Sequence, residues 1–99
     1  IVGGGPAGLS AALILGRCRR KVLVFDHGKP RNAPSDALHA FITRDGIPPK
    51  EFLQKARDDL AKYEDVTLID SEVMTAKVVA KRFEVTLANG EKHYAKKLL

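Results

Sequence analysis

The chain has 99 residues, of which 44% are hydrophobic and 29% are charged, with a formal net charge of +5. This composition is typical of a globular protein and excludes a disordered chain. The basic residues are mixed with acidic ones, and only 6% of the residues are aromatic, so we do not expect a nucleic-acid-binding surface. A membrane-spanning helix needs about 20 consecutive apolar residues, and we expect no membrane partner.

The first helix is expected over residues 6–17, which are apolar on nearly every face and so predict a helix buried all round. A strand is expected over residues 21–26, because residues 22–25 form a continuous apolar run, which is typical of a central strand in a parallel sheet. A second helix is expected over residues 49–63, because Phe52, Leu53, Ala56 and Leu60 form an apolar stripe. A third strand is expected around Val66, Leu68 and Ile69.

Beyond residue 70 the apolar residues alternate, which predicts antiparallel strands. Residues 73–79 and 83–87 are the first two of these, and residues 92–95 return after Asn89-Gly90, a pair typical of a type I′ hairpin turn. Residues 97–99 are expected to begin another strand. The sequence therefore predicts a parallel α/β core with a small antiparallel meander attached to it.

Both ends of the chain suggest a piece of a longer protein. Ile1-Val2 is shorter than a typical strand of about 5–6 residues, there is no initiator Met, and Lys96–Leu99 has the pattern of a strand in mid-course. Cys18 is the only cysteine, and the spacing of the histidines fits no compact ligand set, so we expect no metal site. No signal peptide is visible, and the cytoplasm is the default location.

The most informative motif is the glycine turn, in which Gly3, Gly5 and Gly8 follow a strand stub and open the first helix. In a dinucleotide-binding fold, the first glycine allows the tight turn, and the second lets backbone N–H groups approach a pyrophosphate. The third glycine lets the helix pack closely on the strand. The helix N-terminus supplies unpaired donors and partial positive charge for the phosphates.

Asp26 is the next acidic residue, and it ends the second apolar run. An acid at this place in a dinucleotide-binding unit can accept hydrogen bonds from both hydroxyls of an adenosine ribose. An acid rather than an arginine also disfavours a ribose 2′-phosphate. The residues from the strand stub to Asp26 therefore predict a dinucleotide site.

Residues 27–48 have no clear period and contain several glycines and prolines. Connections longer than about 12–15 residues without secondary structure are usually functional or disordered. Because this one follows Asp26 directly, we expect a loop that covers the ligand. Arg31 and Asn32 carry donors for a pyrophosphate or a carbonyl, and His39 is either a hydrogen-bonding partner of a cofactor ring or a solvated loop residue.

The glycine turn, its spacing to Asp26 and the downstream meander resemble those of the two-dinucleotide-binding flavoproteins. Residues 26–32 and 39–46 resemble the bacterial thioredoxin-reductase-like branch of that group. The resemblance covers essentially the whole chain. It implies a Rossmann-like FAD-binding parallel sheet with an attached antiparallel meander, in which residues 1–99 are the N-terminal part of the FAD-binding domain. The NAD(P)H-binding domain and the rest of the FAD-binding domain would lie outside this chain.

The resemblance also implies a role for particular residues. The glycine turn would hold the FAD pyrophosphate, Asp26 the adenosine ribose, and the segment up to Asn32 the phosphates. His39 would lie near the flavin, and Val73 would present its backbone to the adenine. The implied cofactor-binding residues are Gly3, Gly5, Pro6, Ala7, Gly8, Asp26, His27, Arg31, Asn32, His39 and Val73. Two departures from thioredoxin reductases are Asp26, where Glu is usual, and Ala40, where an Asn often lies near the flavin.

By this resemblance the protein is expected to be an NAD(P)H-dependent flavoprotein oxidoreductase. It would pass electrons through FAD to thioredoxin, a small disulfide or another acceptor, and act as a homodimer. The Cys-x-x-Cys of thioredoxin reductases lies outside this chain, so no catalytic residue is assigned. The alternatives are a flavin monooxygenase or ferredoxin reductase on a similar fold, and a non-catalytic module that binds FAD or NAD. A plain NAD dehydrogenase is disfavoured by the meander and the long loop.

Overall fold

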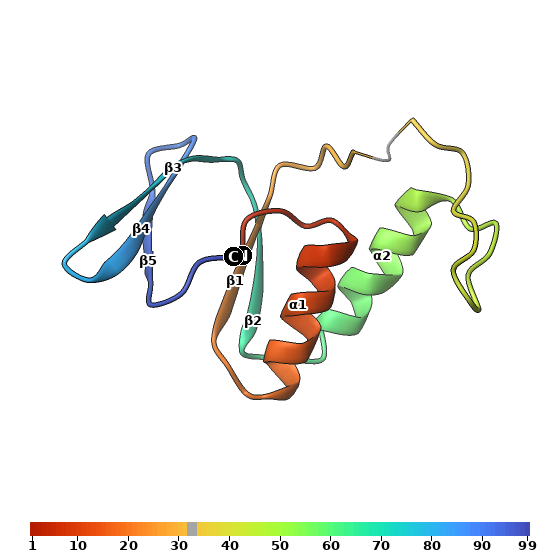
Figure 1. Ribbon diagram of the computed structural model, residues 1–99, viewed down its shortest axis with the longest axis horizontal. Coiled ribbons are helices and arrows are strands. Elements are labelled where there is room, and N and C mark those ends of the chain that lie inside the picture. Colours follow the sequence, from red (N-terminus) through yellow and green to blue (C-terminus); the bar gives the residue numbers. More distant parts are fainter. Residues whose placement is uncertain (32–33) are drawn as a thin grey trace.

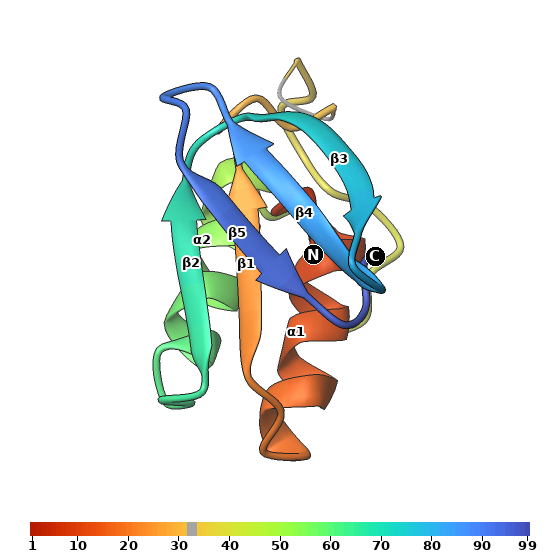
Figure 2. The ribbon, with the colours of Figure 1, turned by 90° about the vertical axis from the view of Figure 1, so that its left-hand side faces the viewer.

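The computed structural model describes residues 1–31 and 34–99, and its elements form three layers (Figures 1 and 2). The middle layer is a parallel pair of strands, β1 (Val22–Asp26) and β2 (Val66–Asp70). Two helices, α1 (Pro6–Arg17) and α2 (Pro49–Leu60), cover one face of this pair. Neither helix, in the part of the chain that the structure describes, is long and apolar enough to cross a membrane.

The third layer is an antiparallel sheet that covers the other face of the parallel pair (Figure 2). Its strands are β3 (Val73–Val79), β4 (Arg82–Leu87) and β5 (Lys92–Ala95), in the order β3-β4-β5. The predicted fold class, a parallel α/β unit with an attached antiparallel meander, is therefore confirmed.

The first residues of the chain extend the parallel layer. Val2 forms a parallel bridge with Phe25, and the N–H of Phe25 donates to the carbonyl of Ile1 at 2.9 Å. On its other side, the N–H of Val2 donates to the carbonyl of Leu99 at 2.8 Å. The strand stub is thus present. Residues 97–99, where a strand was expected to begin, are not a strand of the described structure, although this bond joins Leu99 to the strand stub.

Two apolar clusters hold the layers together, and β1 contributes to both. One lies between the helices and the parallel strands and contains Leu9, Ala12, Val22, Val24 and Leu60; the other lies between β1 and the meander and contains Phe25, Val85 and Leu87. Because side chains on both faces of β1 are buried, its sequence reads as a continuous apolar run rather than an alternating one.

The expected burial of α1 on all its faces is wrong. Leu9, Ala12 and Gly16 are buried, but Ile14 is 61% exposed. The helix meets the sheet and α2 on one side only, so its apolar residues on the other side are left uncovered. Gly16 is needed on the covered side, because a Cβ there would lie 2.7 Å from Cγ2 of Val66.

Helix α2 ends three residues earlier than the predicted 49–63, because it stops at Leu60. The N–H of Ala61 still donates to the carbonyl of Arg57, but the N–H of Tyr63 donates to Leu60 at 3.0 Å in a tighter turn. A further bond from the N–H of Val66 to the carbonyl of Tyr63 leads the chain directly into β2. The apolar stripe locates the helix, whereas this turn decides where it ends.

The turn type predicted at Asn89-Gly90 is also wrong. A type I′ turn needs a positive φ at both central residues, but here only Gly90 has one, with a φ of 86°. The N–H of Gly90 donates to the carbonyl of Leu87 at 2.9 Å, and the N–H of Leu87 donates to Glu91 at 2.8 Å. These bonds describe a three-residue loop, a type I turn followed by a glycine bulge.

The turn with two positive φ values is instead at Ala80-Lys81, between β3 and β4. Ala80 has a φ of 49° and Lys81 a φ of 63°, and the flanking residues Val79 and Arg82 are paired. The sequence did not predict this turn, because neither residue is a type that favours the left-handed region.

Residues 27–31 and 34–48 form turns and extended backbone, as the aperiodic sequence predicted, and run from the end of β1 to the start of α2 (Figure 1). Part of this loop is closed on itself. The N–H of Leu38 donates to the carbonyl of Ile47 at 2.7 Å, and the N–H of Ala40 donates to the carboxylate of Asp45 at 2.8 Å. The ring of Phe41 packs edge-on against Phe52 of α2.

Candidate dinucleotide-binding site

The glycine turn joins the strand stub to α1, and its three motif glycines meet different demands. Gly3 has a φ of 109°, which favours glycine, and its N–H donates to the carbonyl of Phe25 at 2.7 Å. A Cβ on Gly8 would overlap the carbonyl oxygen of Gly3, so this glycine allows the helix to lie against the strand stub. Both features are those expected of a dinucleotide-binding turn.

Gly5 differs from these two, because nothing in the described residues requires it to be glycine. Its backbone is extended, with φ −78° and ψ −177°, and a Cβ built on it meets no atom within 4 Å. It is the N-cap of α1, and Pro6 occupies the first helical position. The first N–H groups of a helix have no partner within the helix, and Gly5 leaves room beside the end of the helix that carries these donors.

Asp26 lies directly beside this turn. It is the last residue of β1, and its side chain is only 16% exposed. A Cβ on Gly4 would lie 2.6 Å from Cγ of Asp26, so the glycine turn and the acid are packed against each other. The prediction that the turn and Asp26 form one site is consistent with this contact, which places the acid beside the helix N-terminus.

The side chain of Asp26 is held by several donors. Its Oδ2 accepts a hydrogen bond from Arg57 at 2.7 Å, and its Oδ1 accepts one from the N–H of Gly28 at 3.3 Å. Burial raises the pKa of this carboxyl. The hydrogen bonds from Arg57, Gly28 and Gly4, together with the charge of Arg57, outweigh burial and hold the pKa below its ordinary value. Asp26 is therefore an ionised acceptor with a fixed orientation.

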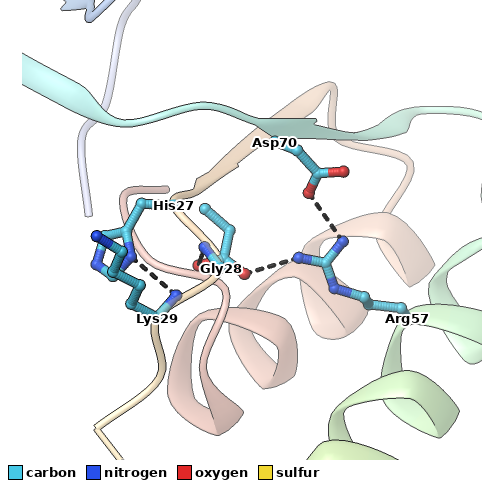
Figure 3. A network of polar contacts seen from close by, with 6 residues as sticks. His27, Gly28, Lys29, Arg57 and Asp70 are labelled. Carbon is cyan, nitrogen blue, oxygen red and sulfur yellow. Dashed lines mark hydrogen bonds and ion pairs between the residues drawn. The ribbon is translucent and has the colours of Figure 1, made fainter.

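Arg57 is the residue of this site that the sequence did not reveal. It lies on α2, and its guanidinium contacts two acids, Asp26 through one terminal nitrogen and Asp70 of β2 through the other at 3.1 Å (Figure 3). A signal was present, since Arg57 follows Leu53 by four residues and precedes Leu60 by three, which puts it on the border of the buried stripe. Its partner was 31 positions away and was not predictable from that spacing.

Two open clefts meet at Asp26. The first, of about 380 Å³, lies at the ends of β1 and β2, and the second, of about 470 Å³, lies between the loop and the start of α2. Asp26 and Gly28 line both clefts. The first is lined by Asp26, His27, Gly28, Lys29, Asp70, Ser71 and Glu72. Ligands of open α/β sheets bind at the carboxyl ends of the strands, and that is where the first cleft lies.

Among the described residues, the other predicted cofactor-binding residues are not gathered around Asp26 as the glycine turn is. His27 is exposed beside the first cleft, and its Nδ1 accepts a hydrogen bond from the N–H of Lys29 at 2.9 Å (Figure 3). Arg31 is exposed, and Asn32 lies outside the described residues. His39 is exposed in the closed part of the loop, where its Nδ1 is 3.6 Å from Asp45. It is not among the described residues that line the two clefts.

Val73 begins β3, two residues beyond Ser71 of the first cleft. Its side chain packs against the cluster of Phe25, Val85 and Leu87, and it pairs in register with Leu87. The structure thus gives Val73 a role in joining the meander to the parallel layer. Its expected contact with the adenine stays a prediction.

The fold and the glycine turn define a Rossmann-like dinucleotide-binding unit. In agreement, residues 1–30 match the family described as "NAD(P)-binding Rossmann-like domain". This stretch contains the strand stub, the glycine turn, α1, β1 and Asp26.

Among proteins that contain such a unit, the chain is most informatively compared with thioredoxin reductases. A probable thioredoxin reductase from Arthroderma benhamiae is 39% identical over the whole chain, and a thioredoxin reductase from Claviceps purpurea is 36% identical. A candidate thioredoxin reductase from Bacillus anthracis, of known structure, is 36% identical and superposes on 96% of the chain with a TM-score of 0.93. The resemblance to the thioredoxin-reductase-like branch is therefore confirmed.

These relatives are much longer than the chain. It spans 26% of the Arthroderma protein and 32% of the Claviceps protein, and it covers 32% of the Bacillus chain. The similarity therefore concerns about a third or less of the length of each relative.

Proposed function

We propose that the chain is the FAD-binding part of an NAD(P)H-dependent flavoprotein oxidoreductase that passes electrons to a disulfide or another acceptor. The observation that carries this proposal is the open space at Gly5. A glycine is present where the described residues leave room for a side chain, at the N-cap of α1, and the neighbouring Gly4 packs against the ionised Asp26. A pyrophosphate joined to an adenosine ribose has the chemistry that such a place accepts.

The residues fit this cofactor. Gly3, Gly5 and Gly8 shape the turn, Pro6 sets the start of the helix, and Ala7 and Gly8 supply backbone N–H groups for the phosphates. Asp26 supplies an acceptor for the ribose hydroxyls. The proposed roles of His27, Arg31, Asn32, His39 and Val73 follow from the resemblance alone. When bound, FAD supplies the redox chemistry, and the task of these residues is to bind and orient it.

The acceptor and the electron donor are proposed from the relatives. Their names as thioredoxin reductases favour thioredoxin or a small disulfide as the acceptor, and the match to an NAD(P)-binding family favours NAD(P)H as the donor. We further propose a cytoplasmic homodimer whose NAD(P)H-binding domain lies outside these residues, as would any redox cysteines.

The experiment uses the full-length protein, purified and analysed for bound FAD by its absorbance and by release of the cofactor. We expect a yellow protein that oxidises NAD(P)H in the presence of a disulfide acceptor. A colourless protein that does not take up FAD refutes the proposal. Binding of FAD without NAD(P)H oxidation would favour a non-catalytic binding module, and reduction of the flavin without disulfide reduction would favour a monooxygenase or ferredoxin reductase.

A further inference from the structure

The carboxyl ends of β1 and β2 each carry an acid, and the two acids lie side by side. Asp26 and Asp70 are partners in the parallel register, and a like-charged pair at this place is unfavourable by itself. Arg57 reaches both from α2, with 2.7 Å to Oδ2 of Asp26 and 3.1 Å to Oδ1 of Asp70 (Figure 3). One cation therefore joins the two strand ends to the helix that covers them.

The two acids differ in their surroundings. The side chain of Asp70 is 80% exposed, so water solvates its charge. The side chain of Asp26 is 16% exposed and that of Arg57 is 25% exposed, so their contact is partly shielded from water. A buried carboxylate without a partner is strongly unfavourable. Asp26 is the acid that depends on Arg57, whereas Asp70 serves to hold the guanidinium in place.

We propose that Arg57 is the positioning residue of the ribose-binding acid, and that it fixes the orientation and charge of Asp26 for the adenosine ribose of the cofactor. This inference rests on the proposed function, because it assigns Asp26 to the ribose. Arg57 acts through Asp26, from the side of α2. The N–H of Gly28 holds the carboxylate from the loop, and Gly4 packs against it from the glycine turn.

The carboxylate of Asp26 can accept hydrogen bonds from its protein partners and from a ribose at the same time. Its two oxygens accept about four hydrogen bonds in all. Arg57 and Gly28 use some of this capacity, and the bond from Gly28 is long at 3.3 Å. A ribose hydroxyl can donate to an acceptor position of the carboxylate that is still free. It can also replace the weak bond from the N–H of Gly28. It meets a carboxylate that is already oriented, so less conformational freedom is lost on binding.

An arginine suits this place better than a lysine. Its planar fork donates through separate nitrogens, which is how Arg57 contacts Asp26 and Asp70 at once. A lysine at the same position is a single point charge and would reach one acid at a time. The conservative substitution is therefore expected to rescue part of the function, and a neutral side chain none of it.

The test compares full-length Arg57→Gln and Arg57→Lys with the wild type, after removal of the cofactor. Lys55→Gln is the matched control, because it removes one positive charge from an exposed position of the same helix. FAD binding is titrated across the acid and neutral pH range, and the folding of each apo-protein is followed by circular dichroism. Among the described residues, the other charged or titratable groups that line the two clefts with Asp26 and Arg57 are unchanged in all variants; they are His27, Lys29, Asp36, Lys50, Asp70 and Glu72.

We expect Arg57→Gln to raise the dissociation constant for FAD about tenfold near neutral pH. Its affinity should begin to fall at a higher pH than in the wild type, because Asp26 loses the partner that keeps it ionised. Arg57→Lys should lie between the two, and Lys55→Gln should match the wild type.

A dissociation constant and pH profile of Arg57→Gln equal to those of the wild type overturn the inference but leave the proposed function intact. A wild-type protein that binds no FAD overturns both. Where Arg57→Gln does not fold, Arg57→Lys decides by the same two readouts. Loss of folding in both variants would show that Arg57 serves the fold rather than the cofactor site.

Discussion

The two glycines at the start of α1 allow a matched test of what the turn does. Gly5 and Gly8 lie in the same turn, and the same change to alanine adds one methyl group at each. At Gly5 the added Cβ meets no atom within 4 Å, and the extended backbone suits any residue. At Gly8 it overlaps the carbonyl oxygen of Gly3 and lies 3.1 Å from the carbon of that carbonyl.

The expected effects on folding follow from these contacts. Gly8→Ala gains about 0.5–1 kcal/mol of helix propensity. It loses about 3 kcal/mol, the upper end of the usual cost of overpacking, because the group that must move is backbone rather than a flexible side chain. The net loss of stability is then about 2 kcal/mol or more. Gly5→Ala changes only the N-cap and should cost a few tenths to about 1 kcal/mol.

The expected effects on cofactor binding are reversed. The methyl group of Gly5→Ala occupies the space proposed for the pyrophosphate and blocks charge-assisted hydrogen bonds worth about 1.5–3 kcal/mol. The dissociation constant for FAD should rise roughly tenfold to a hundredfold. Denaturant unfolding of the apo-proteins and FAD titration measure the two quantities separately. Wild-type affinity in Gly5→Ala would refute the assignment of this space, and equal stability of the two variants would refute the close approach at Gly8.

Four further outcomes are expected. Asp26→Ala should raise the FAD dissociation constant about tenfold to a hundredfold and also destabilise the apo-protein, because Arg57 loses its shielded partner; unchanged apo stability would contradict the pairing. The lowered pKa of Asp26 means that its contribution to stability is present above the ordinary carboxyl pKa and is lost as the pH falls through the folded value. The wild type should therefore lose more stability in acid than Asp26→Asn, and parallel acid-unfolding curves would count against this. Leu60→Ala should reduce the free energy of unfolding by about 2–5 kcal/mol, because Leu60 is 2% exposed in the first cluster; a smaller loss in denaturant unfolding would show that the site collapses. Replacing Ala80-Lys81 by Asn-Gly should stabilise the protein by about 1 kcal/mol, since both positions have a positive φ, and a loss of stability would speak against that turn.

The sequence by itself determined the fold class and the position of the glycine turn. These depend on local patterns, namely glycines at fixed spacing, a continuous apolar run from Val22 to Phe25, and alternation beyond residue 72. The apolar run reports burial on both faces of β1 whichever elements provide it. The demands on Gly3 and Gly8 were also predictable, because they arise within a turn of a few residues and its first helical turn.

Turn types and the exposed side of α1 were decided by the tertiary structure. Asn89-Gly90 has the composition of a type I′ turn, yet the pairing of β4 with β5 places one more residue in the loop. Ala80-Lys81 has an unfavourable composition and still adopts left-handed backbone, because the ladder between β3 and β4 continues to Val79 and Arg82. In both cases the strand register, set by distant side chains, outweighs the local preference.

The contact between Arg57 and Asp26 is the clearest case of a feature that only the tertiary structure decided. The helical stripe in the sequence indicates which side of α2 is buried, but it does not say which strand end that side meets. The parallel register brings Asp26 and Asp70 together, and the packing of α2 on that sheet then carries Arg57 to both. Charge pairs of this kind depend on distance and burial rather than on spacing along the chain, and so they form only once the layers have assembled.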